Sequence, residues 1–290
     1  MSGIADLEDQ VLGEDVALMK KETLMLRKKY DFAFSLGSAC SATQALRQAG
    51  LQYASFPFDW LYGSTLVGRA QLIAEDFKDW IRKDALVAIK PPDDHKTDIW
   101  ENVETGIVFN HDFPRNVPLS ESFAGVEEKY RRRISRFLNQ IERSKRILVF
   151  FLATPIDTLT EDADLLKTVE ILKHRFPGKE FHLLYGHHLP GVSYAQRQTR
   201  ELSPEVTSVG YDYKKRGKLL YPYAVEADES CKILASISVK DYRSAKERRT
   251  FRVLKRQRRY AKYGATCFLG YVVARIASHM RKHLLRTERS

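Results

Sequence analysis

Apolar runs and helical stripes alternate along the middle of the chain. Residues 146–154 (RILVFFLAT) are continuously apolar, which is typical of a strand buried on both faces of a sheet. Residues 125–145 place apolar side chains at helical spacing just before this run. A helix at 161–176 and a second apolar run at 180–186 (EFHLLYG) follow. This order predicts two parallel strands joined by a helix in a right-handed crossover.

The rest of the chain predicts further helices and strands, with no internal repeats and no low-complexity tracts. The predicted fold is therefore α/β, with a mixed or mostly parallel sheet flanked by helices. A polar helix near the N-terminus is predicted to be a packing arm, an oligomerisation helix or a plain surface helix. The predicted elements are helices at 5–29, 41–50 and 64–82, strands at 30–36, 106–114, 206–212 and 231–239, and a loop at 90–98.

Charge separates the end of the chain from its body. The net charge is +11, but residues 241–290 hold 15 Lys/Arg against 3 Asp/Glu, a balance of +12. That leaves 33 basic and 34 acidic residues in 1–240, a balance of −1, which does not favour a nucleic-acid surface on the body. We predict three parts: a helical arm at 1–29, a catalytic-like α/β domain at 30–240 and a basic amphipathic helical tail at 241–290.

The tail has the pattern of a helix that lies on a membrane surface. Its apolar stretch, 264–274, is eleven residues long, which is too short to cross a hydrocarbon core of about 30 Å. One helical face is apolar and is flanked by arginines and lysines. We expect an anionic membrane surface as its partner, with RNA binding or packing against the body as alternatives. The residues of the apolar face are Leu269, Val272, Val273, Ile276 and Met280.

Cysteine usage and the absence of known motifs exclude several classes of protein. Cys40, Cys231 and Cys267 show no CxxC spacing, so they form neither a disulfide framework nor a zinc site, and a reducing compartment is expected. The first 22 residues are acidic and lack the pattern of a secretory signal. We therefore expect a cytoplasmic protein, peripheral at the inner membrane. No HExxH, glycine-rich phosphate loop or GxSxG is present, and we expect no metal and no cofactor.

The stretch FSLGSAC, residues 34–40, is the strongest candidate for chemistry. An apolar run ends at Gly37 and Ser38, and the next residues predict a helix that begins near Cys40. Backbone N–H groups at a helix N-terminus favour negative charge, so we expect them to lower the pKa of the Cys40 thiol. The same groups could donate to an oxyanion.

A cysteine nucleophile needs a base, and His111 is the candidate among the eight histidines. It lies in NHDF at the end of a predicted strand that stops at Pro114. Its neighbour Asp112 should point to the other side of that strand. The alternative is structural, with Cys40 as a small buried hydrophobe and His111 as a core or capping residue.

SFPFDWL, residues 55–61, supplies further candidates. Asp59 lies among aromatic side chains, so it is either a paired structural charge or a site acid whose pKa is raised by its apolar surroundings. Trp60 and its aromatic neighbours could stack on a sugar or form part of the core. We predict Cys40, His111 and Asp59 as catalytic residues, and we predict substrate binding at Gly37, Ser38, Trp60 and Asp112.

Three segments resemble a family that is described as papain-like cysteine peptidases and whose function is unknown. They are FSLGSACSATQALRQAGLQYASFPFDWL at 34–61, GIVFNHDF at 106–113 and KYRRRISRF at 129–137. The resemblance covers roughly residues 30 to 190, and members occur mainly in bacteria, often near genes for surface-polysaccharide assembly. It implies Cys40, after Gly37, as nucleophile and His111 as base.

The resemblance identifies related proteins better than it identifies a reaction, and it leaves Cys40 and His111 as a candidate site. Papain-like sites usually place an antiparallel sheet with the histidine after the cysteine helix, whereas a parallel unit is predicted after His111, which favours a different fold. We expect a thiol-dependent hydrolase or acyl-transfer enzyme that acts on a glycan or lipid-linked substrate in surface-glycan assembly. The alternatives are a transferase that binds the phosphate of an activated sugar at the Gly37 turn, with Asp59 or His111 as base, and a non-catalytic membrane scaffold.

Overall fold

The structure is a computed structural model that describes residues 29–91, 95–155, 157, 159–214, 225–241 and 249. Contacts within the chain group residues 1–240 into one unit and residues 241–290 into a second. The description that follows concerns the first unit. The predicted N-terminal helix, apart from Lys29, and the predicted amphipathic helix of the tail lie outside the described residues.

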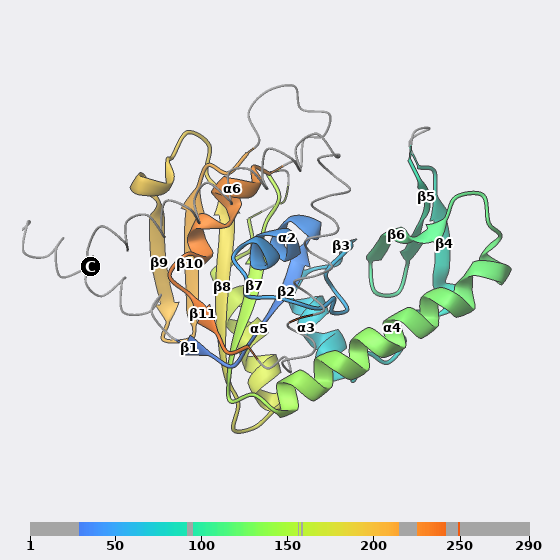
Figure 1. Ribbon diagram of the computed structural model, residues 1–290, viewed down its shortest axis with the longest axis horizontal. Coiled ribbons are helices and arrows are strands. Elements are labelled where there is room, and N and C mark those ends of the chain that lie inside the picture. Colours follow the sequence, from blue (N-terminus) through green and yellow to red (C-terminus); the bar gives the residue numbers. More distant parts are fainter. Residues whose placement is uncertain are drawn as a thin grey trace, which may run out of the picture. The chain divides into compact units, whose positions relative to one another are not determined.

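A five-stranded sheet forms the centre of this unit (Figure 1). Four of its strands are parallel, and the edge strand β9 is antiparallel to its neighbour β10. The predicted α/β fold with a mixed or mostly parallel sheet is therefore confirmed. In spatial order the strands are β2 (Phe32–Ser38), β7 (Arg146–Leu152), β8 (Glu180–His188), β10 (Val206–Tyr211) and β9 (Gln198–Ser203).

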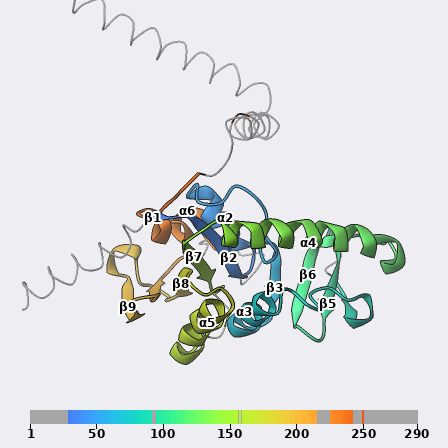
Figure 2. The same ribbon diagram turned by 90° about the horizontal axis from the view of Figure 1, so that it is seen from below.

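Helices cover both faces of this sheet, which explains the continuous apolar runs in its central strands. Figure 2 shows the sheet between α2 (Cys40–Gln48) and α6 (Ala227–Ser230) on one side and α3 (Leu66–Ala74) and α5 (Asp162–Arg175) on the other. Successive side chains of β7 alternate between two apolar clusters, as the pleat requires. Ile147, Val149 and Phe151 belong to the cluster near α5, whereas Leu148, Phe150 and Leu152 belong to the cluster near α2.

A second sheet of four antiparallel strands is inserted in the chain between α2 and β7. The helix α4 (Leu119–Glu142) packs on its strand β6. Only β6 was predicted, so an antiparallel sheet that bears His111 does follow the cysteine helix, in addition to the predicted parallel unit. Its strands, in spatial order, are β3 (Leu61–Gly63), β6 (Ile107–Pro114), β5 (Thr97–Asn102) and β4 (Leu86–Ile89).

Two predicted elements were wrong in extent. The helix predicted at 64–82 ends at Ala74, because the chain then turns through left-handed backbone at Asp76, Phe77 and Asp79. The strand predicted at 231–239 is mostly a short turn of helix, and only its end, β11 (Ser238–Val239), pairs with β1. The remaining short elements are β1 (Lys29–Tyr30), η1 (Lys83–Ala85), η2 (Tyr194–Gln196) and η3 (Lys232–Leu234).

Candidate functional site

The carboxyl ends of β2 and β7 are joined by a small hydrogen-bond network. Ser38 is the last residue of β2, and its hydroxyl bonds to the Asp157 carboxylate and lies 3.3 Å from the Leu152 carbonyl. The Thr154 backbone N–H donates to the Ser38 hydroxyl at 3.2 Å and also to the Asp157 carboxylate. The predicted substrate-binding residue Ser38 is thus fixed at the edge of the sheet, one residue away from the N-cap of α2.

Gly37 makes room for a buried arginine. Its φ is +124°, and a Cβ atom there would lie 2.3 Å from Nη1 of Arg69. The peptide bond between Gly37 and Ser38 is cis. The Arg69 guanidinium, which is fully buried, donates to the carbonyls of Leu36 (2.6 Å), Ser38 (3.1 Å) and Gly63 (2.6 Å). Glycine is therefore required at position 37 by both its backbone conformation and this close approach.

Sequence reasoning missed Arg69. Burial lowers the pKa of its guanidinium to about 10, and the charge of Asp157 acts in the opposite direction. At this pKa the guanidinium stays protonated near neutral pH. It therefore places a positive charge against the carbonyls at the end of β2, the strand that precedes Cys40. A single arginine within the mostly apolar stretch LVGRAQLIA was the available signal, since a cation on the buried face of a helix needs partners.

Cys40 is the first residue of α2 and is half-buried. The N-cap residue, Ala39, has extended backbone (φ −136°, ψ −172°) and offers no capping side chain. Burial raises the pKa of the Cys40 thiol, while the backbone N–H groups of Cys40 and Ser41 lower it in part. The expected lowering was therefore wrong, because desolvation outweighs the helix N-terminus. The thiol is neutral near pH 7 and needs a base before it can act as a nucleophile.

Asp59 is fully buried and ties α2 to the loop that follows it. Its carboxylate accepts hydrogen bonds from the Thr43 hydroxyl (3.1 Å), the Gln52 amide (2.6 Å) and the Phe56 backbone N–H (2.7 Å). The Arg47 guanidinium lies 3.9 Å away. Burial raises the pKa of Asp59 to about 6, although Phe56, Arg47 and Thr43 act to lower it. These contacts favour the structural role among the two that the sequence left open.

Trp60 is half-buried beside this cluster. Its indole N–H donates to the Ser55 hydroxyl at 3.3 Å, and the Arg47 guanidinium lies 5.1 Å from the ring centroid. The ring therefore packs against Arg47 in the last turn of α2, and its role in substrate binding stays a prediction.

His111 lies on β6 with its side chain exposed. Its ring stacks on that of His95, with centroids 6.3 Å apart. Partial desolvation lowers the pKa of His111, with His95 and Lys129 acting in the same direction and Asp112 against them. The Asp112 carboxylate instead accepts a hydrogen bond from Tyr130 (2.8 Å) and pairs with Lys129 on α4. Asp112 thus points away from His111, as neighbours in a strand should.

The predicted pair of Cys40 and His111 is not joined by a hydrogen bond in the part of the chain that the structure describes. Cys40 begins α2, which follows the edge strand β2 of the five-stranded sheet, whereas His111 lies on β6 of the four-stranded sheet (Figure 1). Their catalytic roles stay predictions.

A second histidine, which is not among the predicted site residues, lies at the carboxyl end of the central strand of the main sheet. His188 is the last residue of β8, and its Nε2 lies 3.1 Å from Oδ1 of Asp212. Asp212 also accepts backbone hydrogen bonds from Gly191 (3.0 Å) and Lys214 (3.1 Å). The signal was a histidine pair directly after a strand predicted to be parallel to the strand at 146–154.

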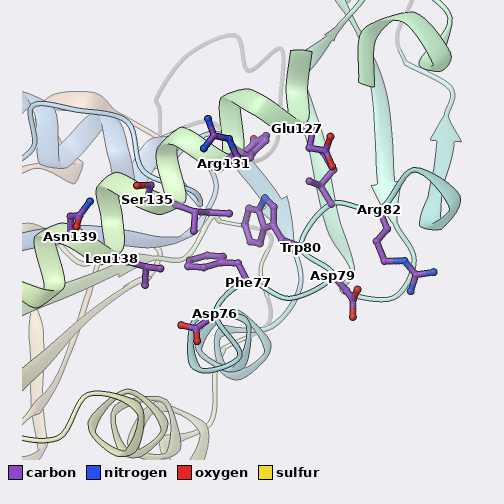
Figure 3. A pocket seen from close by; sticks show the side chains of 13 residues that line it. Asp76, Phe77, Asp79, Trp80, Arg82, Glu127, Arg131, Ser135, Leu138 and Asn139 are labelled. Atoms are coloured by element: carbon purple, nitrogen blue, oxygen red, sulfur yellow. The ribbon is translucent and has the colours of Figure 1, made fainter. Parts of the chain in front are cut away.

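A groove of 730 Å³ between residues 76–82 and α4 contains none of the predicted site residues. In Figure 3, Phe77 and Leu138 point toward each other within it, and the carboxylates of Asp76, Asp79 and Glu127 lie around it. Its lining lies within residues 76–82 and 127–139, outside β2 and α2.

The described residues contain neither a metal-binding cluster nor a membrane-spanning helix. No group of three or more His, Cys, Asp or Glu side chains in the described ranges is arranged to hold a metal ion. None of the helices formed by those residues combines the length and apolar character needed to cross a membrane.

Comparison with known families assigns most of the first unit to one family. A family model described as "Putative papain-like cysteine peptidase (DUF1796)" matches residues 31–188, which is more than half of the 290-residue chain. The chain belongs to this family. The match to the papain-like cysteine peptidase family runs from β2 to the end of β8 and includes Cys40, His111 and His188. No curated protein and no solved structure matches the chain.

The raised pKa of Asp59 predicts how the stability of the folded protein depends on pH. Its folded pKa of about 6 lies above the ordinary value, so between about pH 4 and 6 the folded state holds a proton that the unfolded state has released. The free energy of unfolding should therefore fall as pH rises from 4 through 6, by up to about 3 kcal/mol, and then level off. In Asp59→Asn this decline should be absent.

Denaturant unfolding of both proteins from pH 4.5 to 7.5 measures this difference. Asp164→Asn, at an exposed position on α5, is the matched control and should keep the wild-type slope. Parallel curves for wild type and Asp59→Asn would contradict the assignment.

Proposed function

We propose that the protein is a thiol-dependent hydrolase or acyl-transfer enzyme whose nucleophile is Cys40. The observation that carries this proposal is the position of Cys40 as the first residue of α2, directly past the carboxyl end of β2. In sheets of this kind ligands bind outside the carboxyl ends of the strands. Membership of a papain-like cysteine peptidase family supports the same reading.

The chemistry follows from the surroundings of the thiol. A base removes the Cys40 proton, and the thiolate attacks an acyl carbon while the carbonyl electron pair moves to oxygen. The N–H groups in the first turn of a helix have no partner within the helix, so those of α2 can donate to this oxyanion. A second nucleophile then releases the acyl group from the thiol. If this nucleophile is water the reaction is hydrolysis, and if it is another acceptor the reaction is acyl transfer.

Iodoacetamide should distinguish Cys40 from the other cysteines of the full chain. At pH 7 we expect Cys40 to be alkylated about tenfold faster than Cys231 or Cys267, because a nearby base increases its thiolate fraction. Peptide mass spectrometry over time measures the three rates. Cys231 is a matched comparison, since it is also half-buried and its thiol pKa is also raised by desolvation. Equal rates at all three positions would refute the nucleophile.

The setting of this activity is also part of the proposal. The protein acts on a glycan or lipid-linked substrate in surface-glycan assembly at the cytoplasmic face of the membrane. Support comes from the frequent occurrence of family members near surface-polysaccharide genes and from the +12 charge balance of residues 241–290.

Vesicle binding tests the membrane part of this proposal. Replacing three arginines of the tail by glutamine should weaken binding to vesicles of anionic lipid by about 100-fold, since each basic residue near such a surface contributes about 1 kcal/mol. The tail variant replaces Arg256, Arg258 and Arg259, and a charge-matched control replaces Arg131, Arg132 and Arg143 in the body. Sedimentation with anionic and neutral vesicles measures the binding of each protein. Equal binding of the tail variant and the control to anionic vesicles would contradict the proposal.

A further inference from the structure

The pairing of the parallel strands brings Cys40 and His188 to the same height of the main sheet. Ser38 of β2 pairs with Leu152 of β7, and Leu152 pairs with Gly186 of β8. Cys40 is two residues beyond Ser38, and His188 is two residues beyond Gly186. Neighbouring strands lie about 4.8 Å apart, so the two strand ends are about 10 Å apart. A cysteine and a histidine side chain can meet across this separation.

His188 also lies on the face of the sheet that carries α2. Leu184, four residues earlier on β8, belongs to the apolar cluster that includes the buried side of α2. Tyr213 belongs to the same cluster, and the His188 ring contacts it edge-on at 5.5 Å. His187 faces the opposite side, where its ring stacks on Tyr185 at 5.6 Å. Of the two adjacent histidines, only His188 shares a face with Cys40.

Asp212 holds the His188 ring in a defined orientation. With Nε2 donating to Oδ1 of Asp212, the proton sits on Nε2 and the lone pair on Nδ1. The other Asp212 oxygen accepts the Gly191 N–H, so the carboxylate is itself fixed. Nδ1 has no hydrogen-bond partner among the residues that the structure describes, and the side chain is only 9% exposed. This arrangement leaves one basic nitrogen available on the α2 side of the sheet.

We propose that His188 is the general base for Cys40 and that Asp212 is its positioning residue. This assignment rests on the proposed thiol chemistry and names the base within it. Nδ1 of His188 takes the proton from Sγ, and Asp212 stabilises the imidazolium that forms. The S–C bond to the acyl carbon forms as the carbonyl pair moves to oxygen. When that pair returns, the leaving group departs with the proton from Nδ1, and a thioester remains for water to hydrolyse.

His111 has neither a position on the α2 side of the main sheet nor, in the described part of the chain, a carboxylate that orients its ring. It belongs to the second sheet, its ring stacks on His95, and its neighbouring carboxylate, Asp112, bonds to Tyr130 and Lys129 instead. No carboxylate among the described residues hydrogen-bonds to the His111 ring. His188 has both the orienting carboxylate and a place beside the strand that precedes Cys40.

Alkylation of Cys40 tests the base without any knowledge of the substrate. In His188→Gln the amide can still donate to Asp212 but holds no base, and iodoacetamide should label Cys40 at pH 7 about tenfold more slowly than in wild type. In Asp212→Asn the rate–pH curve of Cys40 should shift to higher pH. His187→Gln is the matched control on the opposite sheet face and should leave rate and curve unchanged. Thermal unfolding of each full-length variant identifies any loss of fold.

The outcomes separate this inference from the proposed function. Slower labelling in His188→Gln together with a shifted curve in Asp212→Asn supports it. Slower labelling in His111→Gln with a wild-type rate in His188→Gln overturns it and restores His111 as base. Wild-type rates in both variants overturn it as well. If Cys40 in the wild-type protein reacts no faster than Cys231, the thiol function itself fails, independently of the base.

Discussion

The buried guanidinium of Arg69 joins the three parts of the protein that meet beside Cys40. From α3 it donates to carbonyls of β2 and of β3, and so connects the end of the main sheet to the start of the second sheet. A buried cation is costly unless its donors are used, and here backbone carbonyls use them. Gly37 is the condition for this arrangement, since any side chain at that position would collide with the guanidinium.

Asp59 ties α2, the helix that begins with Cys40, to the loop that follows it. Its three hydrogen bonds fix Thr43 of α2 to the loop after the helix, while Arg69 and the Ser38 network fix the strand before it. Cys40 therefore starts a helix that is held on both sides. Its thiol is half-buried, and burial raises its pKa, so rigidity alone does not make it reactive. A fixed base is the remaining requirement, and the pair of His188 and Asp212 meets it.

Helices and strands that are determined by residues adjacent in the sequence could be predicted. β7 and β8 were predicted because a strand buried on both faces is apolar throughout, and the start of α2 at Cys40 follows from a strand end next to a helical pattern. β3, β4 and β5 were missed, since they are short or carry polar residues and depend on pairing across the second sheet. α3 was predicted too long because nothing in the local pattern marked the left-handed turns at Asp76 and Phe77.

The site depends more strongly on distant contacts, and less of it could be predicted. The pKa of Cys40 was expected to fall because of the helix N-terminus, but burial raises it. Arg69 lies 29 positions after Cys40 and Asp212 lies 24 after His188, so only the fold brings these groups to one edge.

A crystal structure of the chain alkylated at Cys40 tests the central claim, that His188 is the base for Cys40, most directly. We predict Nδ1 of His188 within about 4 Å of Sγ and the adduct carbonyl facing the first turn of α2. A His188 ring turned away from Sγ, with His111 in its place, would contradict the account.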